Sequence, residues 1–362
     1  KSLHCQKTIN HIFLRALHPD RIRVGIVDQT DTESSCDSPA VPCEEEPNQV
    51  LCKFHGQIDI YPLHPAKDFV VGSILIHHVV ERMYRGEYYV LLTNVNNVMV
   101  SGWDADAIRQ FESLQNEMAI LSTIPTAANE KNFNMTSWSA QRDTRVVLCN
   151  AEFFGESYAT KLLTIVNEDQ PEIVSPSMPQ LCPYWSSDFS FSRGHFVLNV
   201  PFDPYLSVPI NGEDLTMSIR AFTHGYDIYT PEKPLCFYLE SKFNLNRYLQ
   251  KNAEKYPSLS KTIEDRLFGI VRLLPSKSSS SRSYTEKERY GLGSERDPAK
   301  FFATFGIHVQ EKITERNLCN FVSTGGMHIL FQEHMKPDSM GIDYKDIHFR
   351  FHELLNIHEL YN

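Results

Sequence analysis

The sequence predicts an α/β protein in which helices flank a mixed, largely parallel sheet. Strand-like and helix-like segments alternate over the first 275 residues, which is the pattern of a layered α/β fold. Residues 88–93 (YYVLLT) form a nearly continuous apolar run, as is typical of a strand buried on both faces. Residues 6–17 carry Ile9 and Phe13 at helical spacing, which predicts a helix there.

The elements between these landmarks have their own signals. Residues 21–27 (RIRVGIV) read as a short strand, and a loop rich in Ser, Pro, Cys and Glu follows at 30–50. Residues 66–84 carry an apolar stripe at helical spacing and predict a long helix. Asp104 is placed to cap a helix over residues 105–115.

The second half of the main region continues the alternation. We expect strands at residues 117–122, 145–149 and 187–199, the last of them rich in Phe and Val. Residues 212–224 predict a helix, and Gly225 is well placed to end it.

The chain divides into three regions on composition. Residues 1–275 form the main α/β domain. Residues 276–297 contain the polar run SKSSSSRS and predict a linker or loop. Residues 298–362 predict a mixed, partly helical appendage, with helices at 298–304 and 345–357.

Composition limits the classes of function. The 362 residues include 41% hydrophobic and 22% charged residues, which suffices for a core and excludes wholesale disorder. The net charge of −10 disfavours nucleic acid as a partner, and no apolar run is long enough for a membrane span in this chain. Eight cysteines allow disulfides, and Asn134-Met135-Thr136 is a glycosylation sequon. The compartment stays open between the secretory or Golgi lumen and the cytoplasm, and the start at Lys1 suggests a processed or truncated chain.

Two acidic pairs are candidates for chemistry. Asp104 and Asp106 match the D-x-D pattern that binds a divalent ion with a nucleotide diphosphate, although acidic residues at a helix start also stabilise its positive end. The helix-capping interpretation is the stronger one for this pair. Glu213 and Asp214 open the helix at 212–224, where they fit either capping groups or acceptors for sugar hydroxyls. Both interpretations of the second pair remain open.

Several short motifs together resemble the GlcNAc glycosyltransferase family, which includes hydroxyproline N-acetylglucosaminyltransferases of protists and many fungal relatives. The match runs over roughly residues 5–310, with the landmarks in the family's order and spacing. These landmarks are residues 5–9 (CQKTI), 21–29 (RIRVGIVDQ), 84–89 (YRGEYY), 102–104 (GWD), 116–121 (NEMAIL), 185–196, 212–214 (GED), 224–227 (HGYD), 291–294 (GLGS) and 305–307 (FGI).

The resemblance implies a GT-A-like fold, UDP-GlcNAc as donor, a protein hydroxyl as acceptor and transfer with retention. It implies Mn²⁺ as the family's cofactor, and protein glycosylation as the process. It makes Glu213 and Asp214 the catalytic candidates. The candidates for donor binding are Asn94, Asn96, Trp103, Asp104 and His77. The family also places its first strand before the segment that matches residues 5–9, so we expect that strand to be missing from residues 1–275.

The departures from the family concern its metal site. The family's Asp-x-His motif falls on Asn94-Val95-Asn96, and a later His falls on Tyr238, so no metal ligand is assigned. A cationic Arg of the family falls on His77.

Two hypotheses about function follow from these departures. The first is a glycosyltransferase in which basic side chains replace the ion, the candidates being Arg82, Arg85, Arg193 and Arg220. The second is an inactive pseudoenzyme that serves as a scaffold or interaction subunit of a larger assembly.

Overall fold

The structure is a computed structural model of the chain. It describes residues 2–28, 35–63, 72–129, 131–134, 139–155, 162–166, 170–206, 212–239, 265–269, 289–315 and 317–347. The linker expected at 276–297 lies outside the described residues up to residue 288, as does most of the helix expected at 345–357. The boundaries of the three regions therefore stay a prediction.

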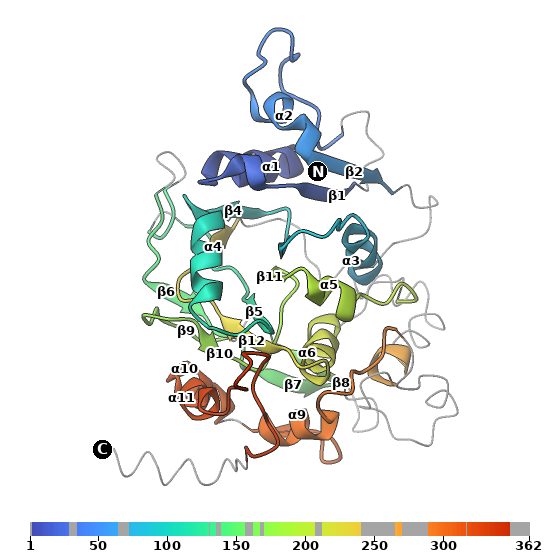
Figure 1. The fold of residues 1–362 in the computed structure, drawn as a ribbon, viewed down its shortest axis with the longest axis vertical. Helices are drawn as coiled ribbons and strands as arrows, with labels where there is room; N and C mark the ends of the chain where they lie inside the picture. Colours follow the sequence, from blue (N-terminus) through green and yellow to red (C-terminus); the bar gives the residue numbers. More distant parts are fainter. Residues whose placement is uncertain are drawn as a thin grey trace.

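The N-terminal part forms a layer of its own at the top of Figure 1. Its sheet consists of β1 (Val24–Asp28) and β2 (Ile58–Pro62), which are parallel. Its helices are α1 (Ser2–Arg15), η1 (Pro19–Arg21), α2 (Val50–Lys53), η2 (His55–Gln57) and α3 (Ser73–Glu81). The long helix expected at 66–84 is shorter in the described residues, since α3 spans only Ser73–Glu81 and residues 64–71 are not described.

A five-stranded sheet forms the centre of the molecule, in the order β10-β12-β5-β11-β3. Its strands are β3 (Tyr89–Thr93), β5 (Ala119–Ser122), β10 (Gln180–Leu181), β11 (Phe189–Arg193) and β12 (Asp227–Thr230). The sheet is mixed, as expected, but the expectation of a largely parallel sheet is wrong. Only β12 and β5 are parallel; the other pairings in this sheet are antiparallel. β11 runs opposite to both of its neighbours, β10 runs opposite to β12, and apolar patterning carries no information on strand direction.

Helices and small strand pairs surround this sheet (Figure 1). The helices are α4 (Trp103–Glu112), α5 (His195–Asn199), α6 (Glu213–Thr223), α9 (Pro298–Thr304), α10 (Leu318–Ser323) and α11 (Gly326–Gln332). The antiparallel pairs are β4 (Asn97–Met99) with β13 (Cys236–Tyr238), β6 (Thr144–Val146) with β9 (Glu172–Val174), β7 (Ala151–Phe154) with β8 (Leu162–Ile165), and β14 (Ile307–His308) with β15 (Ile313–Thr314). The strand expected at 187–199 is divided, because its second half forms α5.

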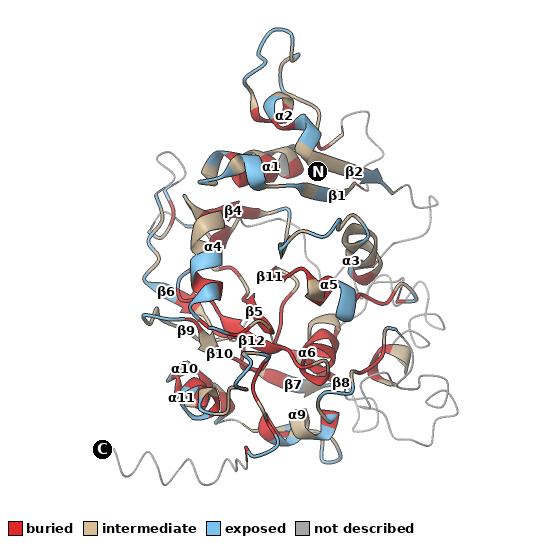
Figure 2. Ribbon diagram, viewed as in Figure 1, coloured by how far each residue is buried: buried red, intermediate tan, exposed pale blue. Residues whose placement is uncertain are grey.

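The core lies between this sheet and α6, where burial is highest (Figure 2). Every residue of β5 and β12 is buried, and so is α6 from Leu215 to Thr223. Burial of apolar surface on this scale is the main force that holds the fold together. A rigid sheet and helix therefore support the N-terminus of α6, where Glu213 and Asp214 lie.

Three disulfides connect six of the eight cysteines. They join Cys5 to Cys36, Cys43 to Cys52, and Cys149 to Cys319. The third spans 170 residues and ties α10 to the segment before β7, so it fixes the C-terminal helices to the main domain. Cys182 and Cys236 are buried free thiols.

Thiol titration checks this pairing. The folded protein, purified without reductant, should show almost no reactive thiol, because burial raises the pKa of Cys182 to about 11 and that of Cys236 still further. The denatured protein should show two thiols per chain, and reduction before denaturation should reveal eight. A count above two without reductant would contradict the pairing.

Candidate functional site

A large cavity separates the N-terminal layer from the edge of the central sheet. Its volume is about 1790 Å³. Its walls come from α1, β1, α3, β3, β11 and the N-terminus of α6. Of the residues proposed from sequence, the following line it: His77, Asn94, Trp103, Asp104, Glu213 and Asp214. A cavity of this size with convergent polar groups is the default position for a ligand site.

The turn before α6 sets the direction of the two catalytic candidates. Gly212 has φ +100°, and a Cβ there would lie 2.9 Å from the ring of Phe268, so a side chain is disfavoured by both conformation and space. Glu213 is the first residue of α6, and its carboxylate accepts hydrogen bonds from Ser73 and forms an ion pair with His77, Nδ1 to Oε1 2.7 Å. Two side chains of α3 thus hold Glu213 at the cavity wall.

Asp214 lies beside Glu213 and faces the turn before β11. Its Oδ1 accepts a hydrogen bond from the backbone N–H of Ser187 at 3.1 Å. Asp188, the residue after Ser187, accepts a hydrogen bond from the side-chain amide of Asn94 at 3.2 Å. The cavity wall therefore carries a cluster that we call the acidic cluster, namely Glu81, Asp188, Glu213 and Asp214.

Burial and mutual repulsion change the protonation of this cluster. Burial, with the charges of Glu213 and Asp188, raises the pKa of Asp214 to about 7. Burial also raises the pKa of Glu81 to about 8 and shifts that of Asp188 upward. For His77, burial lowers the pKa, but Glu213, Asp214 and Glu81 outweigh it and the net shift is upward. The site therefore combines a carboxyl group that titrates near neutral pH with a histidine whose charged form is favoured by the neighbouring carboxylates.

The three positions that the resemblance assigns to a metal site are only partly brought together. Asn94 lines the cavity, whereas Asn96 and Tyr238 are not on its wall. Asn96 contacts the strand β13, since its carbonyl accepts from Leu239 N at 2.9 Å next to Tyr238. Two neutral amides and a phenol lack the carboxylate or imidazole ligands that Mn²⁺ requires, so these residues do not fit a divalent ion. Across the described ranges, no group of three or more His, Cys, Asp or Glu residues could hold a metal.

Asp104 does not cap its helix, which corrects the expectation from sequence. The helix α4 begins at Trp103, two residues before the expected start at residue 105, and follows Gly102 in a left-handed conformation. The carboxylate of Asp104 instead accepts from the backbone N–H groups of Leu17 and His18, at 2.7 and 2.8 Å. Trp103 donates its indole N–H to the carbonyl of Ile12 at 3.0 Å. Both residues line the cavity, but their polar atoms hold α1 in place.

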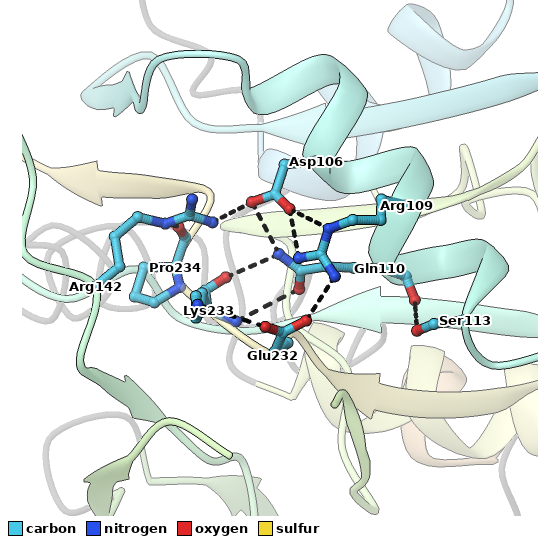
Figure 3. Close-up of polar contacts among 8 residues, drawn as sticks. All are labelled: Asp106, Arg109, Gln110, Ser113, Arg142, Glu232, Lys233 and Pro234. Atoms are coloured by element: carbon cyan, nitrogen blue, oxygen red, sulfur yellow. Dashed lines mark hydrogen bonds and ion pairs between the residues drawn. The ribbon is translucent and has the colours of Figure 1, made fainter. Parts of the chain in front are cut away.

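Asp106 is occupied by arginines rather than by a ligand (Figure 3). Its carboxylate accepts from Arg109, Nη2 to Oδ1 2.6 Å, and from Arg142. Burial raises the pKa of Asp106, but Arg142 and Arg109 outweigh it and hold that pKa below its usual range. Arg109 also pairs with Glu232, Nη1 to Oε2 2.8 Å. The D-x-D pattern therefore has a structural role that connects α4 to the segment before β13.

The four arginines proposed to replace the metal lie elsewhere. None of them lines the cavity in the described part of the chain. Arg193 pairs with Glu117 at 2.7 Å, Arg85 pairs with Asp59 at 2.8 Å, and Arg220 donates to the carbonyl of Pro201 at 2.7 Å. Arg82 is exposed. The basic side chains that do line the cavity are His18, Arg21, Arg23 and His77.

Sequence reasoning missed Asp188 and Glu81. Glu81 lies on α3 one turn after His77, and its Oε2 accepts from Phe202 N at 3.0 Å. Asp188 follows Ser186-Ser187 just before β11. The only signal for Asp188 was its place in the aromatic-rich stretch at 184–229, and nothing local marks Glu81. Both become candidate site residues only because the fold brings α3, β11 and α6 together around the cavity.

Comparisons with known proteins bear on the family. No curated protein matches the chain. One of the similar solved structures is a crystal structure of GalNAc-T7 with UDP, GalNAc and Mn²⁺, at 9% identity and a TM-score of 0.46. That match covers 80% of this chain and 53% of the other, so this chain spans about half of that structure's length.

The family model described as "Glycosyltransferase (GlcNAc)" matches residues 57–311, which is more than half of the chain. The α/β architecture with a central mixed sheet agrees with the α/β class that the sequence predicts, apart from the direction of the strands. The matched range contains the acidic cluster, Asn94 and His77. The chain therefore belongs to the GlcNAc glycosyltransferase family.

Proposed function

We propose that this chain transfers GlcNAc from UDP-GlcNAc to a hydroxyl of a protein acceptor, with retention and without a divalent ion. The observation that carries the proposal is the meeting of Glu213, Asp214 and Asp188 on the wall of a large cavity. Carboxylates are strong hydrogen-bond acceptors, so this wall suits the hydroxyls of a sugar. The family membership supports the reaction class.

Asp214 suits a proton-handling role in this proposal. A pKa of about 7 lets its carboxyl group both hold and release a proton at neutral pH. Glu213 is less free, because Ser73 and His77 already occupy its oxygens. We therefore assign Glu213 to orienting the donor sugar or His77, and Asp214 to orienting the acceptor hydroxyl and exchanging a proton with it.

The leaving diphosphate needs a positive charge nearby to stabilise it. A metal ion is a poor source of that charge here, because the neutral residues Asn94 and Asn96 do not suit a divalent ion. His77 supports a metal-free alternative, since Glu213 lies 2.7 Å from its Nδ1 at the cavity wall and favours its charged form. Arg21 adds a further cationic group to the same cavity, whereas Arg23 already pairs with Asp59, Nη2 to Oδ2 3.1 Å. No helix among the described residues is long and apolar enough to cross a membrane.

Calorimetric titration of UDP-GlcNAc tests the proposal. We expect the same affinity in Mn²⁺ and in EDTA. Glu213→Gln should weaken binding about tenfold or more, since hydrogen bonds to charged groups contribute roughly 1.5–3 kcal/mol. The control is Asp338→Asn, because Asp338 caps an exposed turn through Met340 N and lies outside the cavity. Binding that requires Mn²⁺ would contradict the metal-free mechanism.

The second candidate is a catalytically inactive scaffold or interaction subunit. The neutral residues Asn94, Asn96 and Tyr238 at the family's metal positions favour it, because a lost divalent ion removes much of the stabilisation of the leaving group. An absence of binding in both Mn²⁺ and EDTA would support this candidate over the enzyme.

The disulfides support a location for either candidate. Three disulfides are typical of an oxidising compartment and rare in a reducing cytosol. We therefore favour the secretory or Golgi lumen over the cytoplasm, and protein acceptors that pass through it.

A further inference from the structure

The helix α3 is attached to the rest of the fold largely through polar side chains. Of its nine described residues, only Ile74 is buried. Ser73 and His77 contact the carboxylate of Glu213 at the N-terminus of α6, with His77 Nδ1 2.7 Å from Glu213 Oε1. A helix with so little buried apolar surface belongs to the parts of a protein that open locally at low cost in free energy. The polar contacts therefore decide how firmly α3 is held.

The last turn of α3 makes a second polar attachment, to the segment that follows α5. Phe202 N donates to Glu81 Oε2 at 3.0 Å, and His78 Nδ1 donates to Phe202 O at 2.8 Å. The ring of Phe202 also packs against the ring of His77, with their centroids 4.8 Å apart. Both backbone groups of Phe202 are thus bound by side chains of α3, and each of these side chains can titrate.

Two of these groups favour their protonated forms while α3 is packed on α6. Burial raises the pKa of Glu81 to about 8, against the opposing effect of the hydrogen bond from Phe202 N. For His77, burial lowers the pKa, but the neighbouring carboxylates, Glu213 first among them, outweigh it and the net shift is upward. Both groups therefore bind protons more tightly in the packed state than in a hydrated one, so a rise in pH favours the hydrated state.

The surroundings of His77 and Glu81 are mostly acidic. The charged groups that face them are Glu213, Asp214 and Arg220 from α6, and Asp188 from the turn before β11. Arg220 is already engaged, since it donates to the carbonyls of Pro201 and Gly291 and its charge faces that of Asp203. At alkaline pH the acidic cluster carries its full negative charge, and mutual repulsion then favours separation of α3 from α6.

We propose that α3 is a pH-sensitive latch on the wall of the cavity, closed on α6 under acidic conditions and released as the pH rises through neutrality. The helix lines the cavity through Ser73, His77 and Glu81, so its release uncovers Glu213 and widens the cavity beside the acidic cluster. The pH then sets how easily a ligand reaches that wall. This inference goes beyond the proposed function, because the movement of α3 requires neither transfer nor a bound ligand.

Amide exchange of α3 measures the latch in the full chain. The protection factors of its amides, corrected for the intrinsic exchange rate at each pH, are compared between pH 6 and pH 8. The pKa of Glu81 is about 8 in the closed state against an ordinary 4.5, and between these values it favours opening by up to about tenfold per pH unit. We expect the protection of α3 to fall about tenfold or more, and α3 to exchange faster than β5 and β12 at both pH values because it opens on its own.

Two variants act at opposite ends of this pH range. Glu81→Gln keeps the shape of the side chain and an acceptor for Phe202 N but cannot ionise, so α3 should be better protected than in the wild type at pH 8. His77→Gln keeps a donor toward α6 but carries no charge, so the protection of α3 should fall more at pH 6 than at pH 8. The matched control is His308→Gln, which removes the histidine of an exposed pair, His308 Nε2 to Glu315 Oε1 3.1 Å, and should leave α3 unchanged.

Three outcomes would overturn the latch. One is constant protection of α3 in the wild type from pH 6 to pH 8, a measurement that needs no substitution and so stays decisive if a variant fails to fold. Another is equal protection of the wild type and Glu81→Gln at pH 8, which would place the pH dependence elsewhere. The third is exchange of α3 no faster than that of β12, which would show that α3 opens only when the whole domain unfolds.

Discussion

Arg296→Met is expected to lower the free energy of unfolding by about 3–5 kcal/mol, the cost of removing one partner from a buried ion pair. The Nη2 atom of Arg296 lies 2.9 Å from Oδ1 of Asp227, and the two side chains are 6% and 0% exposed. Arg296 also donates to the carbonyls of Tyr226 and Ile342, at 2.8 and 2.9 Å. Its loss would leave the buried Asp227 carboxylate without its cationic partner and would remove the Arg296 donors from these two carbonyls.

This pair matters because it connects the C-terminal segment to the central sheet. Asp227 is the first residue of β12 and also accepts from Asn116 and from Ile342 N. Urea unfolding at pH 7 measures the effect. Arg85→Met is the control: it breaks a pair with Asp59 in which Arg85 is 54% exposed, and we expect less than about 1 kcal/mol. Equal effects of the two variants would show that the C-terminal segment does not depend on this contact.

The sequence predicted helices better than sheet topology. The helix α6 lies within one residue of the expected range, because Gly212 and Gly225 mark its two ends. The helix α9 matches its expected range, because Pro298 follows the capping residue Asp297. The direction of β11 could not be predicted, since it depends on long-range pairing with β3 and β5 rather than on local pattern.

The same dependence on long-range contacts limits what the sequence predicts about the candidate site. Glu213, Asp214, Asn94 and His77 all line the cavity, while their roles in catalysis and donor binding stay predictions. Asp106 was ambiguous because a carboxylate that binds a metal and one that binds arginines look the same in sequence. Only the tertiary structure brings Arg142 from a distant loop to Asp106.

Asp214→Asn gives the sharpest test of whether the site is catalytic, because it should change activity and stability in opposite directions. We expect transfer to fall about 100-fold or more, within the range for removing a general acid or base. The shape of the side chain is kept, and its oxygen can still accept from Ser187 N. The same Asp338→Asn variant serves as the control for activity.

The stability of the same variant depends on pH in a defined direction. The pKa of Asp214 rises from an ordinary 3.8 to about 7 in the folded protein, because burial and its acidic neighbours disfavour the charged form. Between these values the folded state binds more protons than the unfolded state, so this group's contribution to stability declines as pH increases. Asparagine has no such titration, so Asp214→Asn should gain stability relative to the wild type on going from pH 5 to pH 8. Urea unfolding at the two pH values measures this gain.

The two measurements together separate the candidate functions. An inactive scaffold would show the gain in stability with no transfer to lose, whereas an enzyme would show both effects. A variant that keeps full transfer activity would exclude Asp214 from the chemistry, even if the pH dependence is as expected.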